Sequence, residues 1–122
     1  MLRKIAVALL LVTFGCLTAI AADFNGKWTA EFDTQIGQQR YTYEFHVDGN
    51  KLTGKAVNEQ FGGTDIQEGK IDGDNISFVE VLNFNGSDLR ITYTGKIEGD
   101  EIHFTRQVGE IATEEIVAKR AK

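Results

Sequence analysis

The sequence predicts an all-β protein that folds as a single antiparallel up-and-down barrel of about eight strands. Apolar and polar residues alternate along short segments, and no helical periodicity is present after residue 22. The motif Gly-Lys-Ile-Asp/Glu-Gly-Asp occurs at 69–74 and again at 95–100. An acidic residue and a glycine between alternating apolar residues indicate a tight hairpin turn, because glycine adopts the positive φ that such turns need. The chain also has 13 glycines and no proline, which suits many turns and uninterrupted strand ladders.

A closed barrel is favoured over an open sheet because closure removes exposed strand edges. Consecutive antiparallel strands joined by short turns lie beside one another and produce a meander. About eight strands enclose an interior that is filled by side chains or holds one small ligand. The alternative is a flattened two-sheet β-sandwich. The length of 122 residues allows one such domain, which we place at residues 23–122.

Residues 1–22 are predicted to be a signal peptide. A short basic start precedes an apolar run at 5–12, and Ala-Ile-Ala at 19–21 matches a small-x-small cleavage site. The run is too short to span a bilayer, so we expect no transmembrane segment after cleavage and a secreted or periplasmic location. The single cysteine, Cys16, offers the alternative of a lipoprotein anchor. Cleavage after the Ala-Ile-Ala site leaves a mature chain without a disulfide.

Three strands are predicted in the first half of the domain, at 26–33, 39–48 and 51–58. Every second position in these strands is apolar or small and is assigned to the interior. The inward residues are Trp28, Ala30, Phe32, Tyr41, Tyr43, Phe45, Val47, Leu52, Gly54 and Ala56. The segment 58–65, with Phe-Gly-Gly at its centre, is the least regular stretch and is predicted to be a loop.

Five further strands complete the barrel, and their turns fix the register. The strands are predicted at 66–71, 75–84, 88–97, 101–108 and 113–120. Two-residue turns at 85–86 and 99–100 determine which residues face each other on the inner side. The resulting pairs are Phe84–Ser87, Leu82–Leu89, Glu80–Ile91, Phe78–Tyr93, Tyr93–Arg106, Gly95–Phe104 and Ile97–Ile102.

Three polar side chains fall among these inward residues: Glu80, Tyr93 and Arg106. Buried ionisable groups are costly unless they are paired, so their position needs a reason. One interpretation is a ligand-binding site in which Arg106 binds an anionic or polar group and Glu80 binds a hydroxyl. Tyr41, Tyr43 or Tyr93 then supply aromatic walls. The other interpretation is a structural ion pair, or side chains that reach water at the open end of the barrel.

No catalytic, metal-binding or cofactor-binding motif is present in the sequence. No nucleophile–base pair accompanies Glu80. Both histidines, His46 and His103, fall on predicted outward faces, and Asp-Gly-Asp at 72–74 is better explained by turn chemistry than by calcium. A net charge of −5 argues against nucleic acid or an anionic membrane as a partner.

The predicted strand 75–84 is apolar on both sides, because Val79 and Val81 alternate outward. That face is a candidate surface for a homodimer or for docking to a hydrolase. The alternative is that the segment 58–65 covers it.

The start of the first strand, Gly26-Lys27-Trp28, resembles the Gly-x-Trp start of calycin-type barrels, the group of the lipocalins and fatty-acid-binding proteins. The resemblance implies that Trp28 closes one end of the barrel and that a basic residue of the last strand, Lys119 or Arg120, packs over it. The whole mature chain is also similar to short secreted bacterial β domains with Gly-Lys-Trp-Thr near the start, repeated Gly-Lys-Ile-Asp/Glu-Gly-Asp hairpins and Ala-Lys-Arg at the end. Such domains occur alone or beside extracellular carbohydrate-active hydrolases, so the resemblance implies secretion and fold but no particular activity.

We therefore expect a secreted, non-catalytic binding module for a small apolar or amphiphilic molecule or a glycan, which uses inward aromatics and Arg106. The first alternative is an accessory or interaction domain associated with an extracellular glycoside hydrolase or esterase. The second is a small hydrolase that uses Glu80 as an acid or base. Glycosidases need two carboxylates that flank the scissile bond, and the pattern places only one inside.

Overall fold

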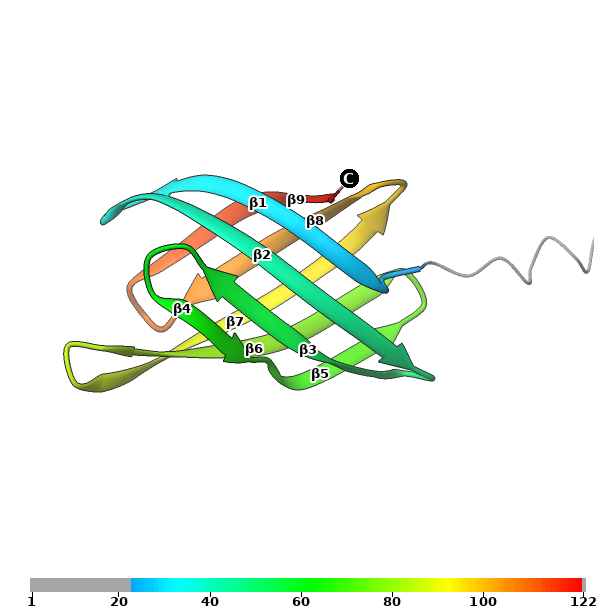
Figure 1. Cartoon of the computed structure of the whole chain (residues 1–122), viewed down its shortest axis with the longest axis horizontal. Helices are drawn as coiled ribbons and strands as arrows, with labels where there is room; N and C mark the ends of the chain where they lie inside the picture. The colour runs from blue at the N-terminus through cyan, green and yellow to red at the C-terminus, as the bar shows by residue number, and fades with distance from the viewer. Residues whose placement is uncertain (1–22, 122) are drawn as a thin grey trace, which may run out of the picture.

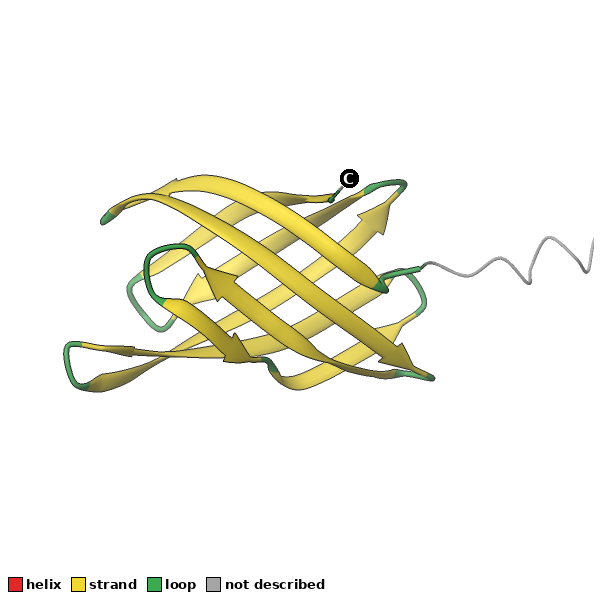
Figure 2. Cartoon of the chain, in the orientation of Figure 1, coloured by secondary structure: helices red, strands yellow, loops and turns green. Residues whose placement is uncertain are grey.

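The computed structural model describes residues 23–121, and these residues form nine β-strands and no helix (Figures 1 and 2). The strands are β1 (Gly26–Thr34), β2 (Gly37–Asp48), β3 (Lys51–Asn58), β4 (Gly62–Asp65), β5 (Gln67–Asp72), β6 (Asn75–Phe84), β7 (Ser87–Glu98), β8 (Glu101–Val108) and β9 (Ala112–Arg120). The predicted signal peptide at 1–22 and Cys16 lie outside the described residues. No described segment is a helix long and apolar enough to cross a membrane.

The strands close into one antiparallel barrel, as the sequence predicts. Neighbours in the sheet follow the order β2-β1-β9-β8-β7-β6-β5-β3-β4, and pairing between β2 and β3 joins the two edges. The wall has eight strands, and β4 is an additional short strand beside β3. The predicted fold class is therefore confirmed in its barrel form, and the two-sheet sandwich is not formed.

The segment 58–65 differs from the prediction, because half of it is a strand. β4 pairs with the last four residues of β3. The turn between them is held by Asn58, whose side-chain oxygen accepts hydrogen bonds from the backbone N–H groups of Gln60 at 2.7 Å and Phe61 at 3.0 Å. The two glycines that begin β4 have low β propensity, so the sequence pattern does not indicate a strand here. Pairing with β3 in the folded barrel stabilises the strand instead.

The predicted registers of β6, β7 and β8 are all present. At the turn between β6 and β7, Asn85 and Gly86 have φ values of 55° and 82°. Two consecutive positive φ values are typical of the type I′ turn that Asn-Gly predicts. As a result Tyr93 of β7 lies opposite Arg106 of β8, and Glu80 lies on the same inner face of β6.

The turns of the meander sort into two groups at opposite ends of the barrel (Figure 1). We call the end that carries the β2–β3, β5–β6 and β7–β8 turns, together with residues 23–25, the closed end. The β5–β6 and β7–β8 turns are the hairpins of the repeated motif, and the β2–β3 turn has the related sequence Asp48-Gly49. We call the opposite end, with the β1–β2, β3–β4, β6–β7 and β8–β9 turns, the open end.

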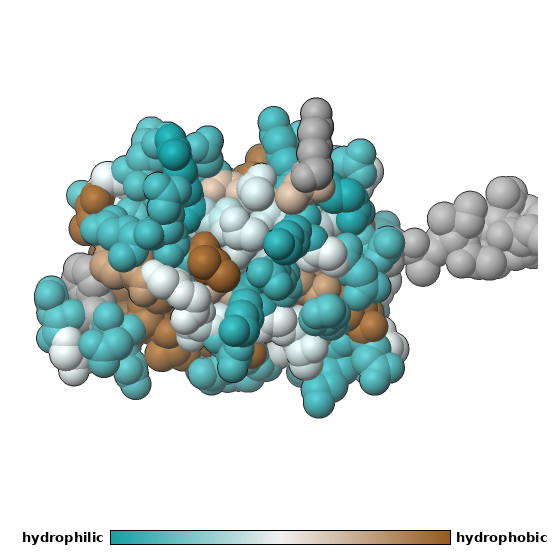
Figure 3. Space-filling model, in the orientation of Figure 1, coloured by the Kyte–Doolittle hydropathy of each residue, from teal (hydrophilic) through white to brown (hydrophobic). Residues whose placement is uncertain are grey.

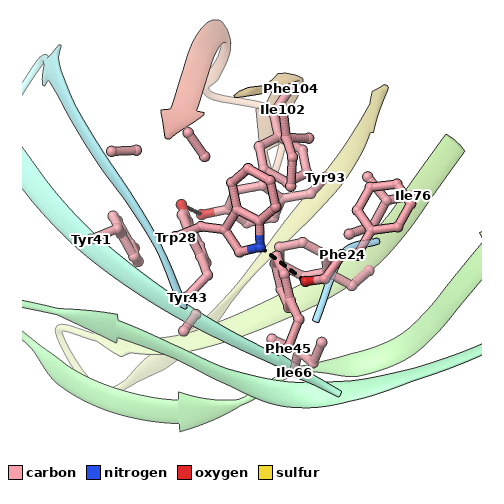
Figure 4. Packing of buried hydrophobic residues seen from close by; sticks show 14 of the residues in the cluster. Phe24, Trp28, Tyr41, Tyr43, Phe45, Ile66, Ile76, Tyr93, Ile102 and Phe104 are labelled. Atoms are coloured by element: carbon pink, nitrogen blue, oxygen red, sulfur yellow. Dashed lines mark hydrogen bonds between the residues drawn. The ribbon is translucent and has the colours of Figure 1, made fainter. Parts of the chain in front are cut away.

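Trp28 closes the barrel at the closed end. It is fully buried beneath Phe24, and its indole N–H donates a hydrogen bond to the Phe24 carbonyl at 2.9 Å (Figure 4). The guanidinium carbon of Arg120 lies 4.3 Å from the centre of the Trp28 ring. Arg120 also donates to two carbonyl groups within residues 23–25. The basic residue expected over Trp28 is therefore Arg120, whereas Lys119 is exposed.

Aromatic side chains fill the middle of the barrel. On β2 the rings of Tyr41, Tyr43 and Phe45 stack in a ladder, with neighbouring centres 5.3 Å and 5.9 Å apart. Tyr93 and Phe104 pack against Tyr43 from the opposite wall (Figure 4). The interior at this level is therefore filled by side chains and holds no deep cup.

The wall between β1 and β9 is paired over only two positions, Trp28↔Arg120 and Thr29↔Lys119. Beyond these pairs the two strands diverge toward the open end (Figure 1). β1 continues to pair with β2 as far as its last residue. The β1–β9 seam is therefore paired only near the closed end.

The outward face of β6 offers less apolar surface than the sequence predicts. Val79 is only 4% exposed although it lies outside the core cluster, and β4 contacts β6. Val81 is half-buried. This arrangement agrees with the alternative in which the segment 58–65 covers the face.

Candidate functional site

A cavity of about 100 Å³ lies at the open end of the barrel. Its apolar lining comprises Ile36, Phe61, Leu82, Leu89, Ile91, Val108 and Ile111. The polar side chains at the cavity include Gln39, Tyr41, Arg106 and Glu114. A concave site that is mostly apolar, with a few convergent polar groups, is the usual form of a small-molecule site.

Ile36, Phe61 and Ile111 form an exposed apolar rim around this cavity, which we call the rim. They are 53%, 39% and 61% exposed, and they account for three of the four large hydrophobic residues that are exposed among those whose burial the structure describes. Each belongs to a different turn of the open end. Apolar groups also reach the surface at this end in Figure 3, on the left. Single exposed apolar residues need no explanation, but three that converge on one cavity indicate a binding surface.

Arg106 lies at the floor of the cavity and is almost fully buried. Its Nε donates to the Tyr93 hydroxyl at 2.8 Å, one Nη to the Tyr41 hydroxyl at 3.0 Å, and the other Nη to Glu114 Oε1 at 2.6 Å. Its guanidinium carbon also lies 5.1 Å from the centre of the Phe32 ring. An arginine remains charged at any physiological pH, so these contacts fix a positive charge beneath the cavity.

Glu80 lies below Arg106 and has no exposed surface. Its two carboxylate oxygens accept hydrogen bonds from the hydroxyls of Tyr41 at 2.7 Å and Tyr93 at 2.8 Å. Each of these hydroxyls in turn accepts a hydrogen bond from Arg106. Because Tyr93 gives its one proton to Glu80, the 2.9 Å hydrogen bond between Tyr93 and Tyr43 is donated by Tyr43. The directions all converge on an ionised Glu80.

Burial acts in the same direction on the pKa of the acid and on the pKa values of its tyrosine donors. Burial raises the pKa of Glu80 above its usual value, while the hydrogen bonds from Tyr41 and Tyr93 and the charge of Arg106 oppose that rise. Burial likewise raises the pKa of Tyr41, Tyr43 and Tyr93, so these hydroxyls keep their protons and remain donors. Within residues 23–121 every buried side-chain N or O atom has a hydrogen-bond partner.

The five residues that the sequence singles out are brought into one network, but at two depths. Arg106 and Tyr41 line the cavity. Glu80, Tyr93 and Tyr43 lie beneath them and hold them in place. The structural interpretation of the cluster and the ligand-binding interpretation are therefore compatible, because the lower residues position the upper ones.

Two cavity residues, Glu114 and Gln39, were missed by the sequence reasoning. Glu114 lies directly opposite Arg106 in the β8–β9 ladder. Glu114 is two residues before the buried Ile116 on the same strand, so the two side chains face the same side. This spacing was the signal that would have placed Glu114 inside. Gln39 is 4% exposed and accepts a hydrogen bond from the Asn58 side chain at 2.8 Å. Gln39 is two residues before Tyr41 on β2, so its side chain faces inward as well.

The described part of the chain forms no metal site, and Glu80, the acid of the hydrolase alternative, is not accessible. Within residues 23–121 no three His, Cys, Asp or Glu residues lie close enough together to hold a metal ion. His46 and His103 are exposed on outward faces, as the alternation predicts. Glu80 is sealed from solvent, and both its oxygens are occupied by tyrosine hydroxyls. The geometry therefore gives no support to the hydrolase alternative.

No protein-family model, no curated protein and no solved structure matches this chain. The comparisons therefore assign no family. The likeness to calycin-type barrels depends on the closed antiparallel barrel and on the packing of Arg120 over Trp28. Secretion and an association with hydrolases stay predictions.

Proposed function

We propose that the domain is a non-catalytic binding module that takes a small amphiphilic molecule at its open end. The apolar part of the ligand packs against Ile36, Phe61 and Ile111, and its polar end meets Arg106 and Glu114 at the floor. The observation that carries this proposal is the cavity itself, which combines an exposed apolar rim with buried, charged groups directly beneath it.

The size of the cavity limits what enters it. Pockets for drug-sized ligands occupy roughly 300–1,000 Å³. The cavity here is about 100 Å³, and the aromatic ladder of Tyr41, Tyr43 and Phe45 fills the barrel below it. One end of the ligand therefore enters the cavity and the rest lies along the rim.

The rim favours an amphiphile over a glycan. Sugar rings pack on exposed aromatic faces, and the rim provides only one aromatic side chain, Phe61, beside the aliphatic Ile36 and Ile111. Aliphatic side chains gain from burial of apolar ligand surface, at roughly 25 cal/mol per Å². An alkyl segment offers such surface and a glycan offers little.

We also propose that the domain acts outside the cytoplasm, because residues 1–22 have the pattern of a signal peptide. The accessory-domain alternative depended on the Val79 and Val81 face. With Val79 buried, that face does not favour docking to a hydrolase or to a second copy.

Binding is tested by calorimetry with 1-octanol as the amphiphile and cellobiose as the glycan. We expect heat of binding and a rise in the unfolding temperature with octanol only. Ile111→Ser should weaken octanol binding, because it removes apolar contact area at the rim. The matched control is Val117→Ser, which removes an exposed large hydrophobic residue that lies away from the rim. A variant Ile111→Ser that binds octanol as well as the wild type does, or a wild type that binds neither probe, contradicts the proposal.

A further inference from the structure

We infer that the site selects an uncharged head group that both donates and accepts a hydrogen bond, such as an alcohol, and that it rejects a carboxylate. Glu114 sets this selectivity. The inference rests on the proposed function, since it concerns the polar end of the same ligand. It narrows the expectation that Arg106 binds an anionic or polar group to the polar, uncharged case.

Charge is the first argument. Arg106 and Glu114 are the only charged residues among the described residues that line the cavity. Arg106 is already paired, because Glu114 Oε1 lies 2.6 Å from one Nη and Glu80 Oε1 lies 3.9 Å from the other. With both carboxylates ionised, the three side chains carry a net negative charge. An incoming carboxylate therefore meets an arginine whose charge is already compensated, together with two like charges in a site of low dielectric.

The unused hydrogen-bonding capacity is the second argument. Three hydrogen bonds from Arg106 reach Tyr93, Tyr41 and Glu114, and a guanidinium has more N–H donors than these three bonds use. Among the described residues, Glu114 Oε2 accepts no hydrogen bond, and the Glu114 side chain is 16% exposed. Two residues that line the same cavity therefore retain unused capacity, Arg106 as a donor and Glu114 as an acceptor.

A hydroxyl pairs with both the donor and the acceptor. Its oxygen accepts from an Arg106 N–H, and its proton is donated to Glu114 Oε2. A carboxylate satisfies the arginine but is repelled by Glu114. An ammonium satisfies Glu114 but faces the arginine, and it leaves the N–H donors unused. A neutral alcohol is the one head group of the three that leaves no buried polar group unpaired.

Glu114 is the specificity-determining residue because it is the carboxylate within reach of the ligand. Glu80 contributes charge from below, but its oxygens are occupied by Tyr41 and Tyr93. Removing the charge of Glu114 while keeping its shape should convert the floor from net negative to neutral. Arg106 would then have a single carboxylate partner, Glu80, at 3.9 Å.

The test compares three probes with one tail: 1-octanol, octanoate and octylammonium, titrated into the wild type near pH 7.5. We expect octanol to bind more tightly than octanoate by about tenfold or more. Glu114→Gln should strengthen octanoate binding by about tenfold and leave octanol nearly unchanged. The matched control is Glu115→Gln, which removes the same charge from the next residue of β9 on the exposed outer face. It should leave all three affinities unchanged.

The outcomes separate this inference from the proposed function. If octanoate or octylammonium binds the wild type as tightly as octanol does, the inference is wrong and the proposed function still holds. If none of the three probes binds, the proposed function itself is wrong. The ranking on the wild type decides both points without any variant, so a Glu114→Gln protein that fails to fold does not leave the question open.

Discussion

The two ends of the barrel each contain an arginine, and the two arginines are used in different ways. Arg120 at the closed end lies over Trp28 and donates to backbone carbonyls near the start of the domain. Arg106 at the open end is buried and donates only to side chains, those of Tyr41, Tyr93 and Glu114. The first arginine seals an end of the barrel, whereas the second lies beneath a cavity and keeps spare donors.

The turns also differ between the two ends: those of the closed end serve the fold, and those of the open end carry exposed apolar residues. At the closed end, the glycines of the three acidic-glycine turns, Gly49, Gly73 and Gly99, have φ values of 65°, 62° and 65°. Each of these turns consists of a glycine followed by a polar Asn or Asp. At the open end three of the four turns carry an exposed Ile or Phe. Apolar side chains that a tight turn does not require are concentrated where the cavity opens, which is why we place the function there.

The largest expected effect comes from removing the plug of the closed end. Trp28→Ala should lower the free energy of unfolding by roughly 3–5 kcal/mol, because it leaves a large cavity and deletes the indole hydrogen bond. Denaturation by guanidinium chloride measures the change. A loss below about 1 kcal/mol would mean that this end is not the stabilising one, and the contrast between the ends would fail.

Replacing each arginine by methionine tests the contrast directly. Arg106→Met should cost about 3 kcal/mol, because it leaves the buried Glu80 without a positive partner. Arg120→Met should cost about 1 kcal/mol, because the side chain is partly exposed and methionine still covers the Trp28 ring. Urea denaturation measures the loss in the free energy of unfolding for both variants. Equal losses would show that the two arginines do the same structural work.

The parts of this structure that the sequence predicts are those controlled by local turn geometry. Two-residue turns fix the register of β6, β7 and β8, so the meeting of Glu80, Tyr93 and Arg106 follows from counting residues. Glu114 was missed because the β8–β9 turn has three residues and does not specify a register by itself. Its parity with Ile116 would have sufficed.

The rim was missed for a different reason. Ile36, Phe61 and Ile111 lie in turns, where alternation carries no information about facing. In an up-and-down barrel, however, alternate turns share an end, so the strand order alone would have brought the three together. The volume of the cavity was beyond prediction, because it depends on how the aromatic rings of the interior pack. That packing is a property of the whole core rather than of any strand.

The acid beneath the open end should make stability depend on pH. The pKa of Glu80 is raised in the folded protein, so the folded state binds its proton more tightly than the unfolded state does. Its favourable contribution is complete below the ordinary pKa of about 4.5 and is lost as the pH rises through the raised value. Relative to Glu80→Gln, the wild type should therefore lose about 1.4 kcal/mol for each unit by which the pKa is raised.

Thermal or chemical unfolding from pH 4 to pH 8 measures this difference between the wild type and Glu80→Gln. The control is Glu115→Gln, which carries the same change at an exposed position. A difference that stays constant across this range would show that burial and the tyrosine hydrogen bonds balance, and that the pKa of Glu80 is not raised.

The smallest expected changes in the free energy of unfolding come from substitutions in the turns, and they should differ between the two ends. Gly73→Ala at the closed end should cost about 1 kcal/mol, because alanine resists the positive φ of 62° found there. Ile36→Ser at the open end should change the free energy of unfolding by less than about 0.5 kcal/mol, because the side chain is 53% exposed. A loss at Ile36 larger than that at Gly73 would show that the rim stabilises the fold. The expected order gives Ile36 little role in stability, so its apolar character is then explained by what binds at the open end.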